Sequence, residues 1–226
     1  MSAADGPGAL TLLHTSPVHV PVFDGLRDRH HPGAALRHLV VPGLLERARA
    51  EGPAAVTGEI EALLSAAEGG DGPVLCTCST IGAVAEALGP ALGRPVLRVD
   101  RPMAAAAVRT GPRIAVLATV ESTLAPTLAL IREEGAALDR ERAGYAAALC
   151  PRPHVVPGAW ERFEAGDDAG CLALVAAAAE AVTDADVIVL AQVSMAGALE
   201  RAVTAIPLLA SPAVGLAAAV GALRRA

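Results

Sequence analysis

Short apolar runs alternate with longer amphipathic stretches along the whole chain. Each run is followed by a segment with the three-to-four-residue apolar spacing of a helix, and a loop rich in Pro and Gly follows residue 150. This alternation is typical of βαβ units with parallel sheets, so the pattern predicts an α/β fold. The predicted strands cover residues 9–14, 36–41, 73–77, 95–99, 113–119, 145–150, 186–191 and 206–210.

The second half of the chain repeats the first. LLHTSPVHVPV (12–22) resembles VLATVESTLAP (116–126), and PVLCTCSTIGAVAE (73–86) resembles VIVLAQVSMAGALE (187–200). Such self-similarity predicts two pseudo-symmetric βα units, each a four-stranded parallel sheet flanked by helices, with an active-site cleft between them.

The repeat also predicts how the chain is divided. We expect a first α/β lobe at 9–111 and a second α/β lobe at 112–226, preceded by a flexible N-terminal tail at 1–8. The last helix could pack back onto the first lobe. A homo-oligomer is possible. The final helices are rich in Ala, and a helix face that packs on a partner subunit has the same composition as one that packs on a sheet.

Composition narrows the class of protein. Hydrophobic residues make up 53% of the 226 positions but aromatic residues only 2%, so Ala, Val and Leu must fill the core. A net charge of −6 provides no basic face for phosphates, which argues against nucleic acid as a partner. The apolar window 206–223 is interrupted by Pro207 and Pro212, so we expect a strand and a buried helix there, with no membrane partner.

Residues 1–8 lack the basic start and apolar run of a secretory signal, and the expected localisation is cytoplasmic. The four cysteines are then expected to be reduced thiols. No glycine-rich nucleotide motif and no clustered metal ligands occur, so we expect no cofactor and no metal.

Polar side chains gather where the predicted strands end. Because ligands bind beyond the carboxyl ends of strands in open parallel sheets, these side chains are the candidate site. The candidates are His14, Thr15 and Ser16 after the first strand, Cys78, Ser79 and Thr80 after the third, Thr119 and Thr123 after the fifth, and Gln192, Val193 and Ser194 after the seventh.

Cys78 is the strongest candidate for an acid or base. It directly precedes a predicted helix, where exposed N–H groups and the helix dipole make a thiol a better acid. A thiolate there could accept a proton, and the thiol could return one. Cys76, Cys150 and Cys171 are predicted to be packing residues.

His14 has two interpretations. Its imidazole could bind a carboxylate or act as a second acid/base at the cleft, or it could be hydrogen-bonded to a neighbouring loop. His38 lies in the polar segment DRHHPGAALRH and is predicted to be solvated. Arg98, Asp100 and Arg101 follow the fourth strand, where we expect surface ion pairs.

Three motifs carry a resemblance to a known family. CST (78–80), VLATVEST (116–123) and VIVLAQVSMAG (187–197) resemble the aspartate/glutamate/hydantoin racemase superfamily, and the likeness extends over nearly the whole chain. The resemblance implies cofactor-independent proton transfer by one cysteine from each half, with hydroxyls and amides holding a carboxylate. By position, Cys78 matches the first cysteine. Its carboxylate-binding neighbours match Ser79 and Thr80, and the second-half threonines match Thr119 and Thr123.

The chain departs from the family pattern at the second cysteine. Gln192 stands there, and Ser194 stands where a histidine often follows. An amide cannot exchange a proton with carbon, but Gln192 and Ser194 can donate hydrogen bonds to a carboxylate or a developing enolate.

We therefore expect a racemase- or isomerase-like enzyme that acts on a small carboxylic acid by proton transfer through Cys78 or by attack of its thiolate. A racemase in which His14 replaces the second thiol is one variant of this expectation. The alternatives are a decarboxylase of a malonate-like acid, whose enolate Cys78 protonates, and a non-catalytic carboxylate sensor.

Overall fold

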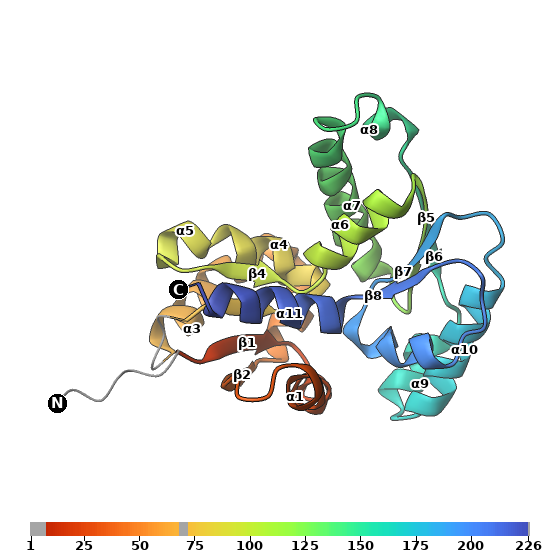
Figure 1. Cartoon of the computed structure of the whole chain (residues 1–226). Coiled ribbons are helices and arrows are strands. Elements are labelled where there is room, and N and C mark those ends of the chain that lie inside the picture. Colours follow the sequence, from red (N-terminus) through yellow and green to blue (C-terminus); the bar gives the residue numbers. More distant parts are fainter. Residues whose placement is uncertain (1–7, 68–71, 226) are drawn as a thin grey trace. The chain divides into compact units, whose positions relative to one another are not determined.

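The chain forms two compact α/β units (Figure 1). The computed structural model describes residues 8–67 and 72–225, so the predicted tail lies outside it except for Gly8. Unit 1 comprises Met1–Val99 and Pro212–Ala226, and unit 2 comprises Asp100–Ser211. The boundary falls after Val99, whereas the sequence analysis placed it after residue 111. The C-terminal helix is part of unit 1.

Unit 1 is built on a four-stranded parallel sheet with the order β2-β1-β3-β4. Its strands are β1 (Leu10–His14), β2 (Leu36–Val40), β3 (Val74–Cys76) and β4 (Val96–Arg98). Its helices are α1 (His19–His30), α2 (Gly43–Glu51), the 3-10 helix η1 (Pro53–Val56), α3 (Thr57–Ala66), α4 (Ser79–Ala87), α5 (Gly89–Leu92) and α11 (Ser211–Leu223).

Successive side chains of a strand point to opposite faces, and the unit 1 sheet buries both. Leu13, Val74 and Cys76 belong to a core cluster that also contains residues of α2, α3 and α4. Their strand neighbours Leu12 and Leu75 are equally buried but lie outside that cluster. Helices therefore cover the sheet of unit 1 on both sides.

Unit 2 repeats this plan with the strand order β6-β5-β7-β8, again all parallel. Its strands are β5 (Arg113–Ala118), β6 (Cys150–Val155), β7 (Val187–Leu190) and β8 (Leu208–Ala210). Its helices are α6 (Arg101–Thr110), α7 (Leu124–Asp139), α8 (Tyr145–Ala148), α9 (Ala159–Glu164) and α10 (Asp168–Glu180), with 3-10 helices η2 (Glu121–Thr123) and η3 (Val193–Glu200). The two sheets confirm the predicted fold class.

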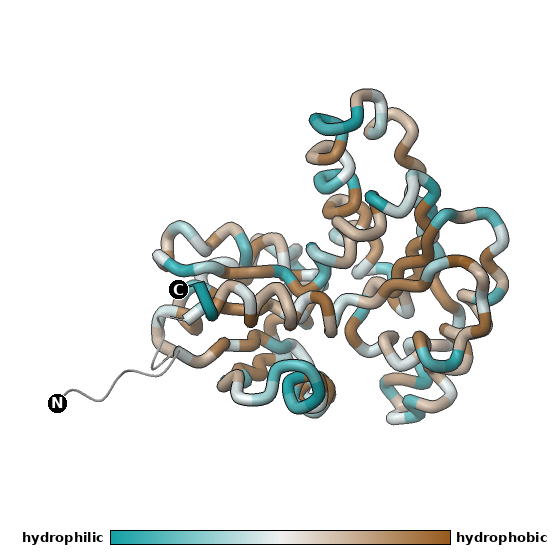
Figure 2. Tube along the Cα trace, in the orientation of Figure 1, coloured by the Kyte–Doolittle hydropathy of each residue, from teal (hydrophilic) through white to brown (hydrophobic). Residues whose placement is uncertain are grey.

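Successive side chains of the central strands of unit 2 pack alternately into two core clusters. Val116 and Val189 pack in a cluster with α6 and α7, whereas Leu117 and Leu190 pack in another with α9 and α10. Residues 114–118 of β5 and all of β7 are apolar, and most of the tube is brown there in Figure 2. The short apolar runs of the sequence are therefore strands buried on both faces.

The strand predicted at 145–150 is wrong. Residues Tyr145–Ala148 form the short helix α8, and the strand is β6, which contains Pro151 and Pro153. β6 pairs only with β5 and is an edge strand. The N–H groups of Cys150 and Val156 donate to β5 and its flanking residue, so the intervening odd-numbered prolines fall at positions facing the open edge. Proline is tolerated at such positions because no ladder hydrogen bond is lost there.

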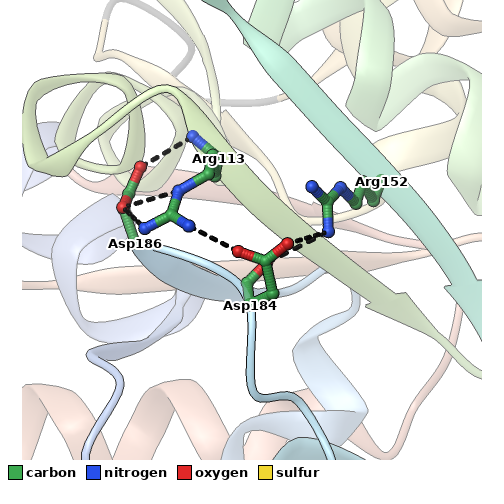
Figure 3. A network of polar contacts seen from close by, with 4 residues as sticks. All are labelled: Arg113, Arg152, Asp184 and Asp186. Atoms are coloured by element: carbon green, nitrogen blue, oxygen red, sulfur yellow. Dashed lines mark hydrogen bonds and ion pairs between the residues drawn. The ribbon is translucent and has the colours of Figure 1, made fainter.

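An ion-pair network joins the amino ends of three segments of unit 2 (Figure 3). Arg113 at the start of β5 binds Asp184 and Asp186, and Arg152 of β6 donates to Asp184 at 2.9 Å. Hydrogen bonds from these arginines lower the pKa of both carboxyl groups. The stabilisation is therefore present at neutral pH and is lost as the pH falls through the lowered pKa values.

Within the described residues, no helix is long and apolar enough to span a membrane. The most apolar window of the sequence, 206–223, is instead divided between β8 and α11. Leu216 and Val220 of α11 are buried in the protein.

Gly215 allows α11 to approach β4 closely. A Cβ atom at position 215 would lie 2.5 Å from the carbonyl oxygen of Val99, a backbone atom that cannot move aside. We expect Gly215→Ala to lower the free energy of unfolding by about 1–3 kcal/mol through overpacking. Urea denaturation followed by circular dichroism measures this change.

Gly221→Ala, in the same helix, is the matched control. A Cβ there would meet only the end of the Arg225 side chain, at 3.4 Å. The gain in helix propensity should make this variant equal to or more stable than the wild type. Equal stability of the two variants would contradict the close packing of α11.

Candidate active site

The candidate residues follow the two central strands of each sheet. In the order β2-β1-β3-β4, the chain leaves the neighbouring strands β1 and β3 toward opposite edges, and the order β6-β5-β7-β8 does the same at β5 and β7. Such a topological switch point is where open α/β sheets bind ligands, because the loops diverge beyond the carboxyl ends. Each unit therefore has one switch point, and the candidate residues flank it.

Cys78 lies at the switch point of unit 1. β3 ends at Cys76, Thr77 follows, and Cys78 is the extended residue before α4. The Cys78 side chain retains 9% of its exposure, whereas Cys76 has none. The first turn of α4 has amide groups without intrahelical partners, which favour negative charge on a thiol or on a bound carboxylate. This position fits the predicted acid/base.

The predicted carboxylate-binding residues of unit 1 lie at the same edge. Ser79 and Thr80 form the first turn of α4 and are 7% exposed, and Thr15 and Ser16 follow β1, which pairs with β3. Thr15 is buried and Ser16 partly exposed. The sheet thus brings both loops to one edge, although they are more than 60 residues apart in sequence.

Arg98 is a residue of this region whose setting the sequence did not indicate. It was expected in a surface ion pair, but it is buried, with 3% exposure, and pairs in register with Cys76. Its side chain passes over α4 at Gly82, where a Cβ would lie 3.0 Å from Arg98 Nε. A buried guanidinium therefore lies beside the strand that leads to Cys78. Arg101 does form the expected surface ion pair, with Glu133.

His14 is fully buried, and both of its ring nitrogens have partners. Nδ1 lies 2.8 Å from the Thr77 hydroxyl, and Nε2 lies 2.8 Å from Nδ1 of His38. His38 was predicted to be solvated, but it is only 16% exposed and is stacked on His14. These contacts correspond to the second interpretation of His14, a hydrogen-bonded histidine. The β1–β2 register could have indicated the pair, since His38 is the diagonal neighbour of His14.

Burial lowers the pKa of His14 to about 3, with further contributions from His38 and His19. Burial likewise lowers the pKa of His19 to about 4, and its Nδ1 is buried without a hydrogen-bond partner. Both rings are therefore neutral at physiological pH. A neutral His14 without solvent access is poorly suited to exchange a proton with a substrate.

In unit 2, Thr119 and Gln192 contact each other directly. The backbone N–H and the hydroxyl of Thr119 both donate to the Gln192 side-chain oxygen, at 2.6 and 3.0 Å. Because a backbone N–H can only donate, the amide atom that faces it must be the oxygen. The Gln192 amide nitrogen therefore points away from Thr119 with its two N–H bonds available to another acceptor.

The other predicted residues of unit 2 surround this pair. Thr123 is buried at the N-cap position of α7, and its side chain makes no capping hydrogen bond. Ser194 is partly exposed and Val193 is buried, both at the start of η3. Ser122, which was not predicted, has a buried hydroxyl without a partner. Such a group next to Thr123 indicates an acceptor that the protein itself does not supply.

Among the residues that the structure describes, no group of three or more His, Cys, Asp or Glu side chains is arranged to hold a metal ion. The candidate residues of unit 1 are thus a thiol, hydroxyls and a buried guanidinium, and those of unit 2 are hydroxyls and an amide.

Solved structures with the same fold are enzymes of related chemistry by their names. Glutamate racemase from Bacillus anthracis aligns at 18% identity with a TM-score of 0.64, over 96% of this chain and 82% of that one. Allantoin racemase from Pseudomonas fluorescens aligns at 17% identity with a TM-score of 0.61, over 96% and 91%. Arylmalonate decarboxylase aligns at 18% identity with a TM-score of 0.57, over 95% and 92%.

The protein thus shares its fold with these racemases over nearly its whole length. No protein-family model matches the sequence, and no curated protein gives a significant match.

The lowered pKa values of His14 and His19 predict an acid-sensitive fold. Since the folded pKa values lie below the unfolded value of 6.5, the unfolded state binds more protons, and stability present above pH 6.5 is lost as the pH falls. Each of the two rings should lower the free energy of unfolding by about 2 kcal/mol as the pH falls from 6.5 to 5. In His14→Gln the loss over this interval should shrink by one such contribution, as urea titrations at both pH values would show.

His154→Gln removes an exposed histidine of β6 and serves as the control, with an unchanged pH dependence. If the His14 variant loses as much stability as the wild type between these pH values, His14 is not a buried neutral histidine.

Proposed function

We propose that this chain is a cofactor-independent, racemase-like enzyme that moves a proton at a carbon atom of a small carboxylic acid. Cys78 is its one acid/base, and Gln192 supplies hydrogen bonds. The observation that carries the proposal is the orientation of the Gln192 amide, whose oxygen accepts from Thr119 and whose N–H bonds are left for a substrate. The proposal requires that the switch points of both units act on one substrate.

The substrate carboxylate would be held by the first turn of α4. Ser79 and Thr80 supply hydroxyls there, and the backbone N–H groups of the turn are further donors. The Cys78 thiolate removes a proton from the carbon next to the carboxylate, and the electron pair passes to the carboxylate as an enolate. The N–H bonds of Gln192 stabilise the oxygen on which charge develops. In an unsaturated substrate the electron pair is delocalised over a second carbon. The thiol delivers the proton to that carbon, which shifts the double bond, and the thiolate is regenerated.

This arrangement favours one-base chemistry over two-base racemisation. Gln192 has no ionisable group, and His14, the other candidate for a second base, has both nitrogens engaged. A single thiol can relocate a proton within a substrate. It can also add to the double bond of an unsaturated diacid, allow rotation about the resulting single bond, and leave again.

Decarboxylation is the second candidate. A malonate-like acid that loses CO2 leaves an enolate, which needs one stabilising donor and one proton. The Gln192 N–H bonds and the Cys78 thiol would supply these in turn, and water would reprotonate the thiolate. The likeness to arylmalonate decarboxylase over most of both chains supports this candidate alongside the first.

Replacement of Cys78 tests the proposal. The protein is incubated in D2O with amino acids, unsaturated diacids and substituted malonates, and deuterium uptake, isomer formation and CO2 loss are followed by NMR. We expect turnover of at least one class by the wild type and a loss of about 10²–10⁴-fold in Cys78→Ala, the usual cost of removing a general acid/base. Circular dichroism should show an unchanged fold.

Cys150→Ala is the control, because Cys150 is exposed at the amino end of β6 and should not affect turnover. Undiminished turnover in Cys78→Ala would overturn the assignment. Thermal stabilisation by a carboxylate without turnover of any compound would instead favour the sensor alternative.

A further inference from the structure

A chain of hydrogen bonds leads from the surface of unit 1 to the residue before Cys78. Asp24 of α1 is 37% exposed in its side chain, and its Oδ1 lies 3.3 Å from Nε2 of His38. Nδ1 of His38 lies 2.8 Å from Nε2 of His14, and Nδ1 of His14 lies 2.8 Å from Oγ1 of Thr77. Four side chains from α1, β2, β1 and the end of β3 are thus connected in series.

The sheet register explains why these side chains meet. Leu12 pairs with His38 and also with Leu75, so residues 12, 14, 38 and 77 alternate onto the same face of the sheet. That face is covered by α1, whose Phe23 ring lies 5.6 Å from His14. Cys78 belongs to the core cluster with Leu13 and Cys76 and so lies on the other face.

Two arrangements of the protons give every hydrogen bond from Thr77 to Asp24 one donor and one acceptor. Thr77 Oγ1 has one proton, and it also lies 3.1 Å from the carbonyl oxygen of Leu13. If the hydroxyl donates to Leu13, His14 must donate from Nδ1 and accept at Nε2. His38 then donates from Nδ1, and it can also donate to Asp24 only as a cation.

In the other arrangement His38 is neutral. It donates from Nε2 to Asp24 and accepts from His14 Nε2–H, so His14 Nδ1 has no proton and must accept one. The Thr77 hydroxyl then turns from Leu13 to His14. The carbonyl oxygen of Leu13 keeps its bond from the Thr77 N–H, at 3.0 Å, so this change leaves no backbone group unpaired. The two arrangements therefore differ by one proton on His38 and by the direction of one hydroxyl.

The residue types resemble those of a nucleophile–base–acid triad, but the geometry excludes that role. Thr77 is 2% exposed, and its hydroxyl lies on the face covered by α1. A substrate at the carboxyl end of β3 would meet Cys78 instead. The series of hydrogen bonds from Asp24 to Thr77 is therefore placed to act on the backbone next to Cys78.

That backbone is held by the same contacts. Thr77 N–H and Oγ1 both contact the Leu13 carbonyl, and the Cys76 thiol donates to the carbonyl of Cys78 at 3.6 Å. A change in the Thr77 hydrogen bonds alters the peptide that sets the direction of the Cys78 side chain at the start of α4.

We propose that His14, His38 and Thr77 are positioning residues for Cys78, and that gain or loss of one proton at His38 selects between the two hydrogen-bond arrangements of these side chains. The titratable and charged groups that face it are Asp24 and His19 of α1, with Arg27 of α1 3.2 Å from Asp24. The inference rests on the proposed function only in that Cys78 is taken as the reacting group.

The test measures the reactivity of the thiol without any substrate. In a Cys150→Ser background, the rate of Cys78 alkylation by iodoacetamide is followed by peptide mass spectrometry from pH 5 to 9. Cys78 is 9% exposed, whereas Cys76 and Cys171 are 0% and 1% exposed and should react more slowly. Nitrogen-15 NMR of the imidazole rings reports in parallel the tautomer of His14 and the titration of His38.

We expect the alkylation rate of the reference protein to change about three- to tenfold where His38 titrates, beyond the change due to thiol ionisation. His38→Asn, which offers a hydrogen-bonding group near the Nδ1 position but does not titrate, and Thr77→Val should both lose this component. Thr77→Ser should restore it. His30→Asn, an exposed histidine of α1, is the matched control and should retain it.

A Cys78 alkylation profile that is the same in all five proteins would overturn the inference, as would a protein in which Cys78 is not alkylated at all. Thr77→Ser keeps the test available if Thr77→Val does not fold. The results of this test can be distinguished from those that test the proposed function. Coupled alkylation without turnover of any carboxylate would support the inference and count against the enzyme, and turnover without coupling would do the reverse.

Discussion

The parallel pairing of β1 with β3, and of β5 with β7, is the constraint on which the candidate site depends. Parallel strands end at the same edge of a sheet, and at these two pairs the chain turns away toward opposite edges. Residues that are far apart in sequence therefore lie at the same edge of the sheet. The same strand order in both units gives the protein two such places, one per repeat.

The two places differ in their chemistry. Unit 1 has a thiol at the start of a helix, beside a buried arginine, whereas unit 2 has an amide fixed by Thr119. The amide is held by a backbone donor, which leaves its direction no freedom, and it can stabilise charge but cannot carry a proton. The proposed one-thiol mechanism follows from this difference, because Gln192 occupies the position where a second thiol would be needed.

Much of the fold could be predicted from sequence because strands buried on both faces are short, apolar and regularly spaced. The strand β6 was missed because its two prolines indicate a loop, and only its place at the sheet edge makes them tolerable. The structure divides the chain after Val99, because α6 packs on the sheet of unit 2. The hydrophobic pattern identifies α6 as a helix but does not show on which sheet it packs. Gly82 and Gly215 allow Arg98 and Val99 to pack closely against helices. The sequence around these glycines does not reveal this role, because it depends on which residue packs against each of them.

The candidate site was predictable in its positions and less so in its electrostatics. Cys78, Gln192 and the hydroxyls follow strand ends and could be found from the pattern. The state of His14 could not be, because it depends on His38, which lies across the sheet in a segment whose composition is that of a solvated turn. Burial, which decides whether a histidine titrates at physiological pH, is a tertiary property.

The stereochemistry of turnover in D2O tests the central claim most directly. A single thiol delivers its proton from one face, so for a substrate that gives a chiral product, the wild type should form one enantiomer. Gln192→Cys, which places a second thiol in unit 2, should form both. A racemic product from the wild-type protein, formed without Cys at position 192, would contradict the account.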